Sequence, residues 1–213
     1  MNKTIVIFLL LTHQLIAQKT KTVDLYKLQS KEKLSVVNRE IKSVEENGKK
    51  FVRVSEAQGE GIVWLPVKNF KKGTLEIEMR GKDVLQRSFI GVVFHAQNDS
   101  TFDAVYCRPF NFFAQDSIRR IHAVQYISHP EYTWQVLRNT RNAEFEKEII
   151  SPPDPNSWFT MSVEINEKAV KTYINKASQP SLVVNKLTKV KNGKIGIFVG
   201  SGSGGDFSIV RIL

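Results

Sequence analysis

The chain has 213 residues, with 31 Lys and Arg against 21 Asp and Glu, and its formal net charge is +10. The basic residues are scattered and alternate with glutamate, as in the segment from Glu144 to Glu148, which is typical of solvated faces and turns. With no basic helix or aromatic-basic motif, nucleic acid is not an expected partner, although the positive charge suits an acidic glycan. Cys107 is the only cysteine, so no internal disulfide can form.

The first residues match the pattern of a secretory signal peptide. Lys3 is followed by the apolar run Ile5 to Leu11 and by the small residue Ala17. We therefore expect a signal peptide at residues 1–17 and a single domain at residues 18–213. The signal peptide predicts export, to the periplasm or the extracellular space. No stretch reaches the roughly 20 apolar residues that a membrane span needs, so no membrane span is expected.

Alternation of apolar and polar residues dominates the rest of the chain. Leu75, Ile77 and Met79 share one face of a predicted strand, and Glu76 and Glu78 share the other. No segment shows a convincing helical period. Strands are expected, in chain order, at 50–54, 74–80, 89–95, 102–110, 121–127, 132–138, 159–165, 170–174 and 195–199.

Turn signals separate these strands. Asn47-Gly48 and Asn192-Gly193 favour hairpins, and three prolines between Ser151 and Pro155 exclude regular pairing there. About a dozen short strands at this spacing predict an all-β fold, an antiparallel two-sheet jelly-roll sandwich.

Four segments carry a family resemblance: Gly73-Thr-Leu-Glu-Ile-Glu-Met-Arg80, Ile90-Gly-Val-Val-Phe-His95, Phe102-Asp-Ala-Val-Tyr-Cys-Arg-Pro-Phe110 and the closing run from Ile195 to Ile212. Over residues 50–213 the chain resembles the concanavalin A-like lectin and glucanase superfamily, and within it the laminin-G-like and 3-keto-disaccharide-hydrolase-type domains. The resemblance implies a curved jelly roll whose concave sheet faces a saccharide. In the hydrolase-type domains one strand carries Glu-Val-Gln, and the corresponding triplet here is Ala123-Val-Gln125, without the carboxylate.

Alternation also selects the candidate binding residues. Val105 and Cys107 suit a buried face, which directs Tyr106 and Arg108 toward a cleft. Tyrosine offers a stacking surface, and arginine offers a planar fork for hydroxyls or a carboxylate; an ion pair with a neighbouring strand is the alternative for Arg108.

Three further residues complete the candidate set. The resemblance favours Gln125 as a contact, and alternation then assigns His122 to the core or an edge, because both cannot face the cleft without a bulge. His95 ends its strand beside the loop at 97–101, a usual place for a ligand contact. Trp134 could stack on a sugar or pack in the core. The substrate-binding candidates are His95, Tyr106, Arg108, Gln125 and Trp134.

The sequence contains no motif that is specific for a metal site or for catalysis. The histidines lack zinc-site spacing, and no metal or cofactor is expected, although Asp99, Asp103 or Asp206 could contribute to a calcium site. Glu76 and Glu78 are spaced like a catalytic pair but read as a solvent-facing strand, so the catalytic residues stay unknown.

We therefore predict an exported carbohydrate-binding domain whose partner is a saccharide or glycan, and the positive charge of the chain suits an acidic one. A glycoside hydrolase of the 3-keto-disaccharide hydrolase type and a laminin-G-type protein-interaction module are the alternatives.

Overall fold

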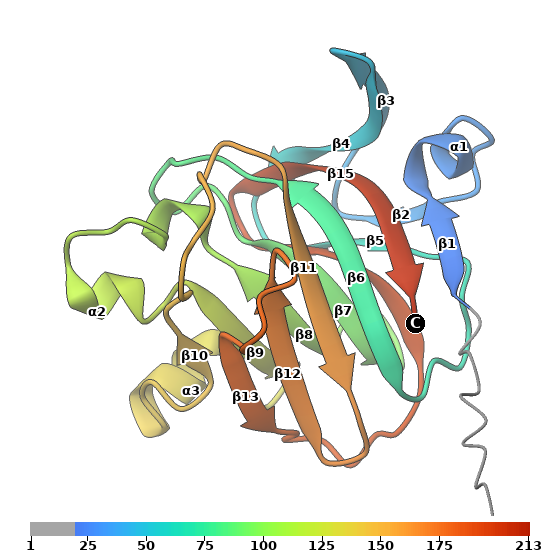
Figure 1. Ribbon diagram of the computed structural model, residues 1–213. Helices are drawn as coiled ribbons and strands as arrows, with labels where there is room; N and C mark the ends of the chain where they lie inside the picture. Colours follow the sequence, from blue (N-terminus) through green and yellow to red (C-terminus); the bar gives the residue numbers. More distant parts are fainter. Residues whose placement is uncertain (1–19) are drawn as a thin grey trace, which may run out of the picture.

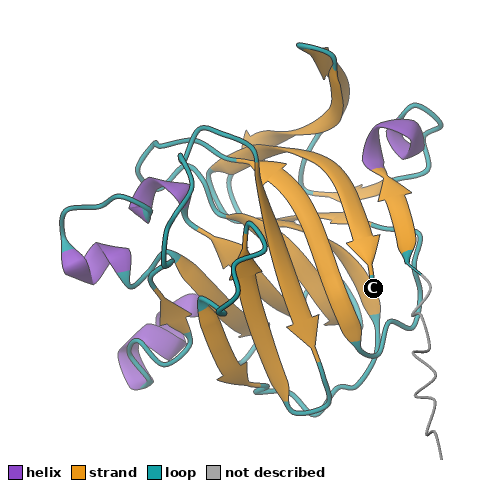
Figure 2. Cartoon of the chain, in the orientation of Figure 1, coloured by secondary structure: helices purple, strands orange, loops and turns teal. Residues whose placement is uncertain are grey.

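The computed structural model describes residues 20–213, so the predicted signal peptide at residues 1–17 lies outside the described residues. Two antiparallel sheets pack face to face, and short helices lie at two sides of the sandwich, α1 (Leu25–Gln29) at one and α2 (Ser117–Arg120) and α3 (Trp134–Thr140) at the other (Figure 1; Figure 2). This is the two-sheet jelly roll that the alternation predicts. Within the described residues, no helix is long and apolar enough to cross a membrane.

The eight-stranded sheet lies at the front of Figure 1. The strand β15 pairs along one edge with β6, and along the other with β4 and then β1. In order the strands are β13 (Leu182–Asn185), β12 (Ala169–Ile174), β11 (Phe159–Ile165), β6 (Gly73–Arg80), β15 (Ser203–Ile212), β4 (Lys49–Ala57) and β3 (Ile41–Glu46), with β1 (Lys21–Asp24) beside β15.

The seven-stranded sheet lies behind it and carries the candidate site. Its order is β10 (Glu146–Lys147), β9 (Val124–His129), β8 (Phe102–Cys107), β7 (Ile90–Ala96), β14 (Lys194–Val199), β5 (Gly61–Trp64) and β2 (Ser35–Val37).

Helices occupy connections, not the sandwich itself. The helix α1 (Leu25–Gln29) follows β1, while the 3-10 helix η1 (Pro109–Asn111) and α2 (Ser117–Arg120) connect β8 to β9. The helix α3 (Trp134–Thr140) follows β9 and contacts it. In Figure 1, α2, α3 and β10 lie at the same side of the molecule.

Two of these connections correct the expected strands. Residues 132–138 were expected to form a strand, but Trp134–Thr140 is helical because the Thr133 side chain caps it by accepting the Val136 N–H at 3.3 Å. The strand expected from Ile121 begins only at Val124, since the preceding residues form the end of α2 and a turn.

The core lies between the sheets and follows the predicted alternation. Leu75, Ile77 and Met79 of β6 are at most 1% exposed. The Cys107 thiol lies 3.7 Å from the sulfur of Met161 on the facing sheet. Burial raises the pKa of this thiol, so Cys107 acts as a small buried hydrophobe.

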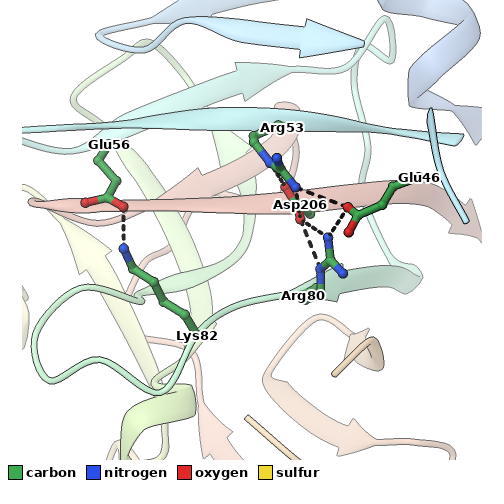
Figure 3. A network of polar contacts seen from close by, with 6 residues as sticks. All are labelled: Glu46, Arg53, Glu56, Arg80, Lys82 and Asp206. Carbon is green, nitrogen blue, oxygen red and sulfur yellow. Dashed lines mark hydrogen bonds and ion pairs between the residues drawn. The ribbon is translucent and has the colours of Figure 1, made fainter. Parts of the chain in front are cut away.

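Ion pairs cover the outer face of the eight-stranded sheet. Asp206 of β15 accepts from Arg53 of β4 and Arg80 of β6, and Glu46 at the hairpin tip pairs with both arginines (Figure 3). On the same face, Glu76 pairs with Arg211 at 2.6 Å and Glu78 with Lys49 at 2.7 Å. These two glutamates therefore neutralise neighbouring cations, although Glu76 is buried and not solvent-facing as expected.

Candidate functional site

One row of side chains crosses the outer face of the seven-stranded sheet, on the side turned away from the core. In register, Phe198 pairs with Gly91, Gly91 with Tyr106, Tyr106 with Gln125, and Gln125 with Glu146. A Cβ at Gly91 would lie 2.5 Å from the Tyr106 Cα, so this position requires glycine. The rings of Tyr106 and Phe198 approach above it, with centroids 5.2 Å apart. The row therefore begins with aromatic side chains on β14 and β8 and ends with polar side chains on β9 and β10.

Arg108, directly after β8, joins the polar end of this row. Its Nη2 donates to the Tyr106 hydroxyl at 3.0 Å and also to Gln125 Oε1, while Nη1 donates to the His122 carbonyl at 2.7 Å. The Tyr106 hydroxyl donates to the same Gln125 oxygen at 2.8 Å. The guanidinium also lies over the rings of Tyr106 and Phe89, at 5.0 and 5.5 Å from their centroids. These contacts fix the orientation of Arg108.

Glu146 supplies a buried carboxylate at the end of the row. Its Oε2 lies 2.8 Å from His122 Nδ1 and 3.5 Å from Arg108 Nη1, and Arg138 donates to both oxygens at 3.2 and 2.9 Å. Glu146 is 2% exposed. Burial is the largest cause of the lowered pKa of His122, and Glu146 opposes it. Nδ1 of His122 is close to the carboxylate but lacks the geometry of a hydrogen bond to it.

A cleft of about 900 Å³ opens above Tyr106 and Arg108. This volume lies within the range of small-molecule sites, roughly 300–1,000 Å³. The walls come from η1, α2, α3, the connection before β7, the turn before β5 and the turn after β14. Its lining residues include Gln58, Glu60, Leu85, Arg87, Phe89, Tyr106, Arg108, Phe110, Asn111, Arg119, His122, Trp134, Arg138, Phe198 and Ser201.

Glu60 lines the cleft from the turn before β5. Its Oε2 lies 3.4 Å from Nδ1 of His129 on β9, although β14, β7 and β8 separate the two strands. In a flat sheet the strands would be about 19 Å apart, because neighbours are spaced by about 4.8 Å. The outer face is therefore hollowed between Glu60 and β9. Burial raises the pKa of Glu60 to about 7, opposed by the charge of Arg39.

Four of the five predicted binding residues meet at this place. Tyr106, Arg108 and Trp134 line the cleft, while Gln125 lies directly beneath it and is fully buried. Trp134 reaches the cleft from a helix instead of the expected strand, with Arg138 stacked 5.1 Å from its ring centroid. Gln125 is thus placed to orient Tyr106 and Arg108.

His95 lies elsewhere. A bulge between β7 and β14 and a φ of +50° at His95 break the alternation that was expected to align it with Gly91. The ring turns toward Asp103, 3.9 Å away, and its Nε2 contacts the Lys71 carbonyl at 2.9 Å. His95 is 2% exposed, and burial lowers its pKa to about 4. It is not among the residues that line the cleft.

Two residues of the site differ from expectation. His122 was assigned to the core or an edge by strand alternation, but it precedes β9 and lines the cleft. Glu146 was included in a segment interpreted as solvated, yet it is buried next to Gln125. Its neighbours in sequence give no signal for this, because Glu146 follows the buried Phe145 and alternation would place it on the opposite, exposed face.

The aspartates considered for calcium lie apart. Asp99 accepts from Trp64 Nε1 at 3.0 Å, Asp103 is enclosed between the sheets, and Asp206 binds two arginines. Across residues 20–213, no three histidine, cysteine or acidic side chains form a group that could hold a metal ion.

Comparison with protein families and with curated proteins gives no match for this chain. Solved structures do match. The carbohydrate-binding module CBM66 from Bacillus subtilis superposes with a TM-score of 0.54 and 13% identity, covering 84% of this chain and 91% of the module. A Bacillus subtilis protein of unknown function with a galectin-like fold gives a TM-score of 0.57 and 11% identity, with 90% and 94% covered.

A third match is the exoplasmic/lumenal domain of VIP36 in its Ca²⁺/Man3GlcNAc-bound form, with a TM-score of 0.52 and 10% identity over 84% of this chain and 82% of that domain. At these identities the similarity concerns the fold. The described chain therefore has the concanavalin A-like jelly-roll fold that its sequence motifs predict.

Proposed function

We propose that this chain is an exported carbohydrate-binding domain, and that the cleft on the seven-stranded sheet binds a saccharide with an acidic group. The observation that carries the proposal is the fixed layer of Tyr106, Arg108, Gln125 and Glu146 beneath the cleft. Ligand sites combine apolar walls with a few polar groups held in place, and this layer has both. The names of the matching carbohydrate-binding module and the Man3GlcNAc-bound lectin domain support the same class of ligand.

The acidic group follows from the charges. Arg87, Arg108, Arg119 and Arg138 line the cleft, whereas Glu60 is the only carboxylate among the lining residues. Glu146 lies behind the wall and is shared by two of the arginines. Arginine is suited to planar recognition of a carboxylate or sulfate, so a uronic acid or a sulfated sugar fits better than a neutral one.

A glycan array followed by calorimetry with the best ligand tests this proposal. Arg108→Lys should weaken binding at least tenfold, about 1.4 kcal/mol, because lysine cannot reproduce the fork between Tyr106 and Gln125. Arg211→Lys is the matched control, because Arg211 pairs with the buried Glu76 on the other sheet. This variant should bind the ligand as tightly as the unmodified protein. An array without any bound glycan, or equal affinities for both variants and the unmodified protein, would contradict the proposal.

Glycoside hydrolysis is a second candidate, favoured by one observation. The hydrolase-type triplet has a glutamate two residues before Gln125, where this chain has Ala123. In the fold, Glu146 pairs with Gln125 from the neighbouring strand, and its carboxylate lies 2.8 Å from Nδ1 of His122, which lines the cleft. An imidazole oriented by a carboxylate is suited to general acid/base chemistry. Release of sugar from a 3-keto-disaccharide, abolished by His122→Gln, would support this activity, and no release would leave binding alone.

A further inference from the structure

Most of the exposed apolar side chains lie in the connections beside the cleft. Within the described residues, eight large hydrophobic side chains are exposed. Six of them lie in the three connections that contribute residues to the cleft, and two of these, Leu85 and Trp134, line it directly. Exposed apolar groups gathered in one place mark an interaction site, whereas isolated ones do not. The six are Val84, Leu85, Phe113, Ile118, Trp134 and Val136.

The apolar surface continues from the rim into the cleft. Leu85 is 57% exposed and Trp134 is 43% exposed, while Phe89 and Phe110 behind them also line the cleft, with ring centroids 5.3 Å apart. Phe198 at the floor is buried beside Tyr106. A hydroxyl-rich sugar ring stacks on one or two aromatic faces. The aliphatic Leu85 and the exposed part of Trp134 instead offer contact area to a hydrocarbon.

The same cleft has an excess of positive charge. Arg108 and Arg138 share the single carboxylate of Glu146. Arg119 donates to neutral acceptors, the side chain of Asn111 at 3.3 Å and the carbonyl of Phe110 at 3.0 Å. At least two guanidinium charges are therefore without a carboxylate of their own. The arginines lie among the apolar side chains, with Arg138 over the Trp134 ring and Arg108 over the Phe89 ring. An anionic group and an apolar group joined to it would therefore both find contacts in one cavity.

We propose that the ligand of this cleft is amphipathic: an acidic saccharide joined to an alkyl or aryl group, with the saccharide near the arginines and the apolar group along Leu85 and Trp134. This inference rests on the proposed function and adds the class of aglycone. It accounts for the exposed apolar side chains of Leu85 and Trp134, which a free sugar would not cover.

Calorimetry with two glucuronides tests the inference on the full chain. Octyl β-D-glucuronide, below its micelle-forming concentration, should bind at least tenfold more tightly than methyl β-D-glucuronide, because the octyl chain removes apolar surface from water. Leu85→Ser should reduce this ratio at least threefold. Val183→Ser is the matched control, because Val183 is 55% exposed on β13 of the other sheet and should keep the ratio. Both positions are exposed, so both variants are expected to fold.

The outcomes separate the two proposals. Equal affinity for the methyl and octyl glucuronides would overturn the amphipathic ligand and leave the acidic saccharide in place. Octyl sulfate binding as tightly as octyl glucuronide would support the apolar and anionic walls but contradict a saccharide. If neither glucuronide binds at millimolar concentration, both proposals are wrong.

Discussion

Arg108 and Arg138 reach the same carboxylate from different parts of the chain, one directly after β8 and the other on α3. Glu146 is nearly inaccessible to solvent and has His122 as a third partner. Removing one member of a buried charge group leaves the others without compensation, which costs several kcal/mol. Glu146 therefore holds two cleft arginines at fixed positions although it does not line the cleft.

Glu60 should make ligand binding depend on pH. Its pKa of about 7 means that the side chain is largely neutral at pH 6 and ionised at pH 8. The charged groups that face it are Arg39 and, when protonated, His129, whose pKa is lowered by burial. We expect an acidic ligand to bind a few-fold more tightly at pH 6 than at pH 8. Glu60→Gln should flatten the profile between these values, and an unchanged profile in calorimetry would exclude Glu60 as the cause.

Asp103 gives a prediction for stability. It is enclosed between the sheets, and neither carboxylate oxygen has a well-formed hydrogen bond, although Ser128 and Tyr126 lie close enough to oppose the shift. Burial raises the pKa of Asp103 to about 6 from an ordinary 3.8. Between these values the folded state keeps a proton that the unfolded state has lost, so stability falls as the pH rises through this window.

Asp103→Asn should therefore stabilise the protein at pH 7.5, by roughly 1–3 kcal/mol, and the gain should shrink between pH 6 and pH 4. Urea unfolding at several pH values measures it. Glu146→Gln is the matched control, since that buried carboxylate has three cationic or imidazole partners and its loss should destabilise the fold. A destabilised Asp103→Asn variant at pH 7.5 would show that the ionised form is well accommodated.

At the scale of elements, alternation predicted which face of the sheet the strand side chains occupy, but it did not predict the positions of side chains in the connections. It placed the β6 side chains and the pair Tyr106 and Cys107 on their observed faces, because a regular strand has a period of two. It misplaced His122 and His95, since one precedes its strand and the other sits in a bulge. Glu146 could not be found from its neighbours in sequence, because its partners come from three other segments.

The helix α3 carries two cleft residues on one face, Trp134 and Arg138. Thr133 caps its N-terminus through the Val136 N–H. Thr133→Ala should cost about 1 kcal/mol of helix stability and weaken ligand binding a few-fold, because both residues depend on the first turns. Thr140→Ala removes a side-chain hydrogen bond to the Val136 carbonyl at the far end and is the control. Equal affinities of the two variants in calorimetry would contradict a role for the cap in the site.

At the scale of the whole molecule, the two outer faces differ in how their charges are arranged. On the eight-stranded sheet the cations lie beside carboxylates, as Arg53 and Arg80 do around Asp206 and Glu46 (Figure 3). On the cleft side, Arg108 and Arg138 share the buried carboxylate of Glu146, and Arg119 donates to neutral acceptors. The cleft therefore has an excess of positive charge, which would attract an anionic ligand.

Salt should consequently weaken binding of an acidic oligosaccharide, several-fold between 50 and 500 mM NaCl, because the Debye length shortens from about 14 to about 4 Å over this range. Arg119→Gln should reduce the salt dependence, since this guanidinium lines the cleft and donates to neutral acceptors. Arg53→Gln removes the same charge from the opposite sheet, where Asp206 pairs with it at 2.7 Å, and should leave the salt dependence unchanged. Calorimetry at four salt concentrations compares the slopes. Equal slopes for both variants would mean that the net charge of the chain, and not its position at the cleft, attracts the ligand.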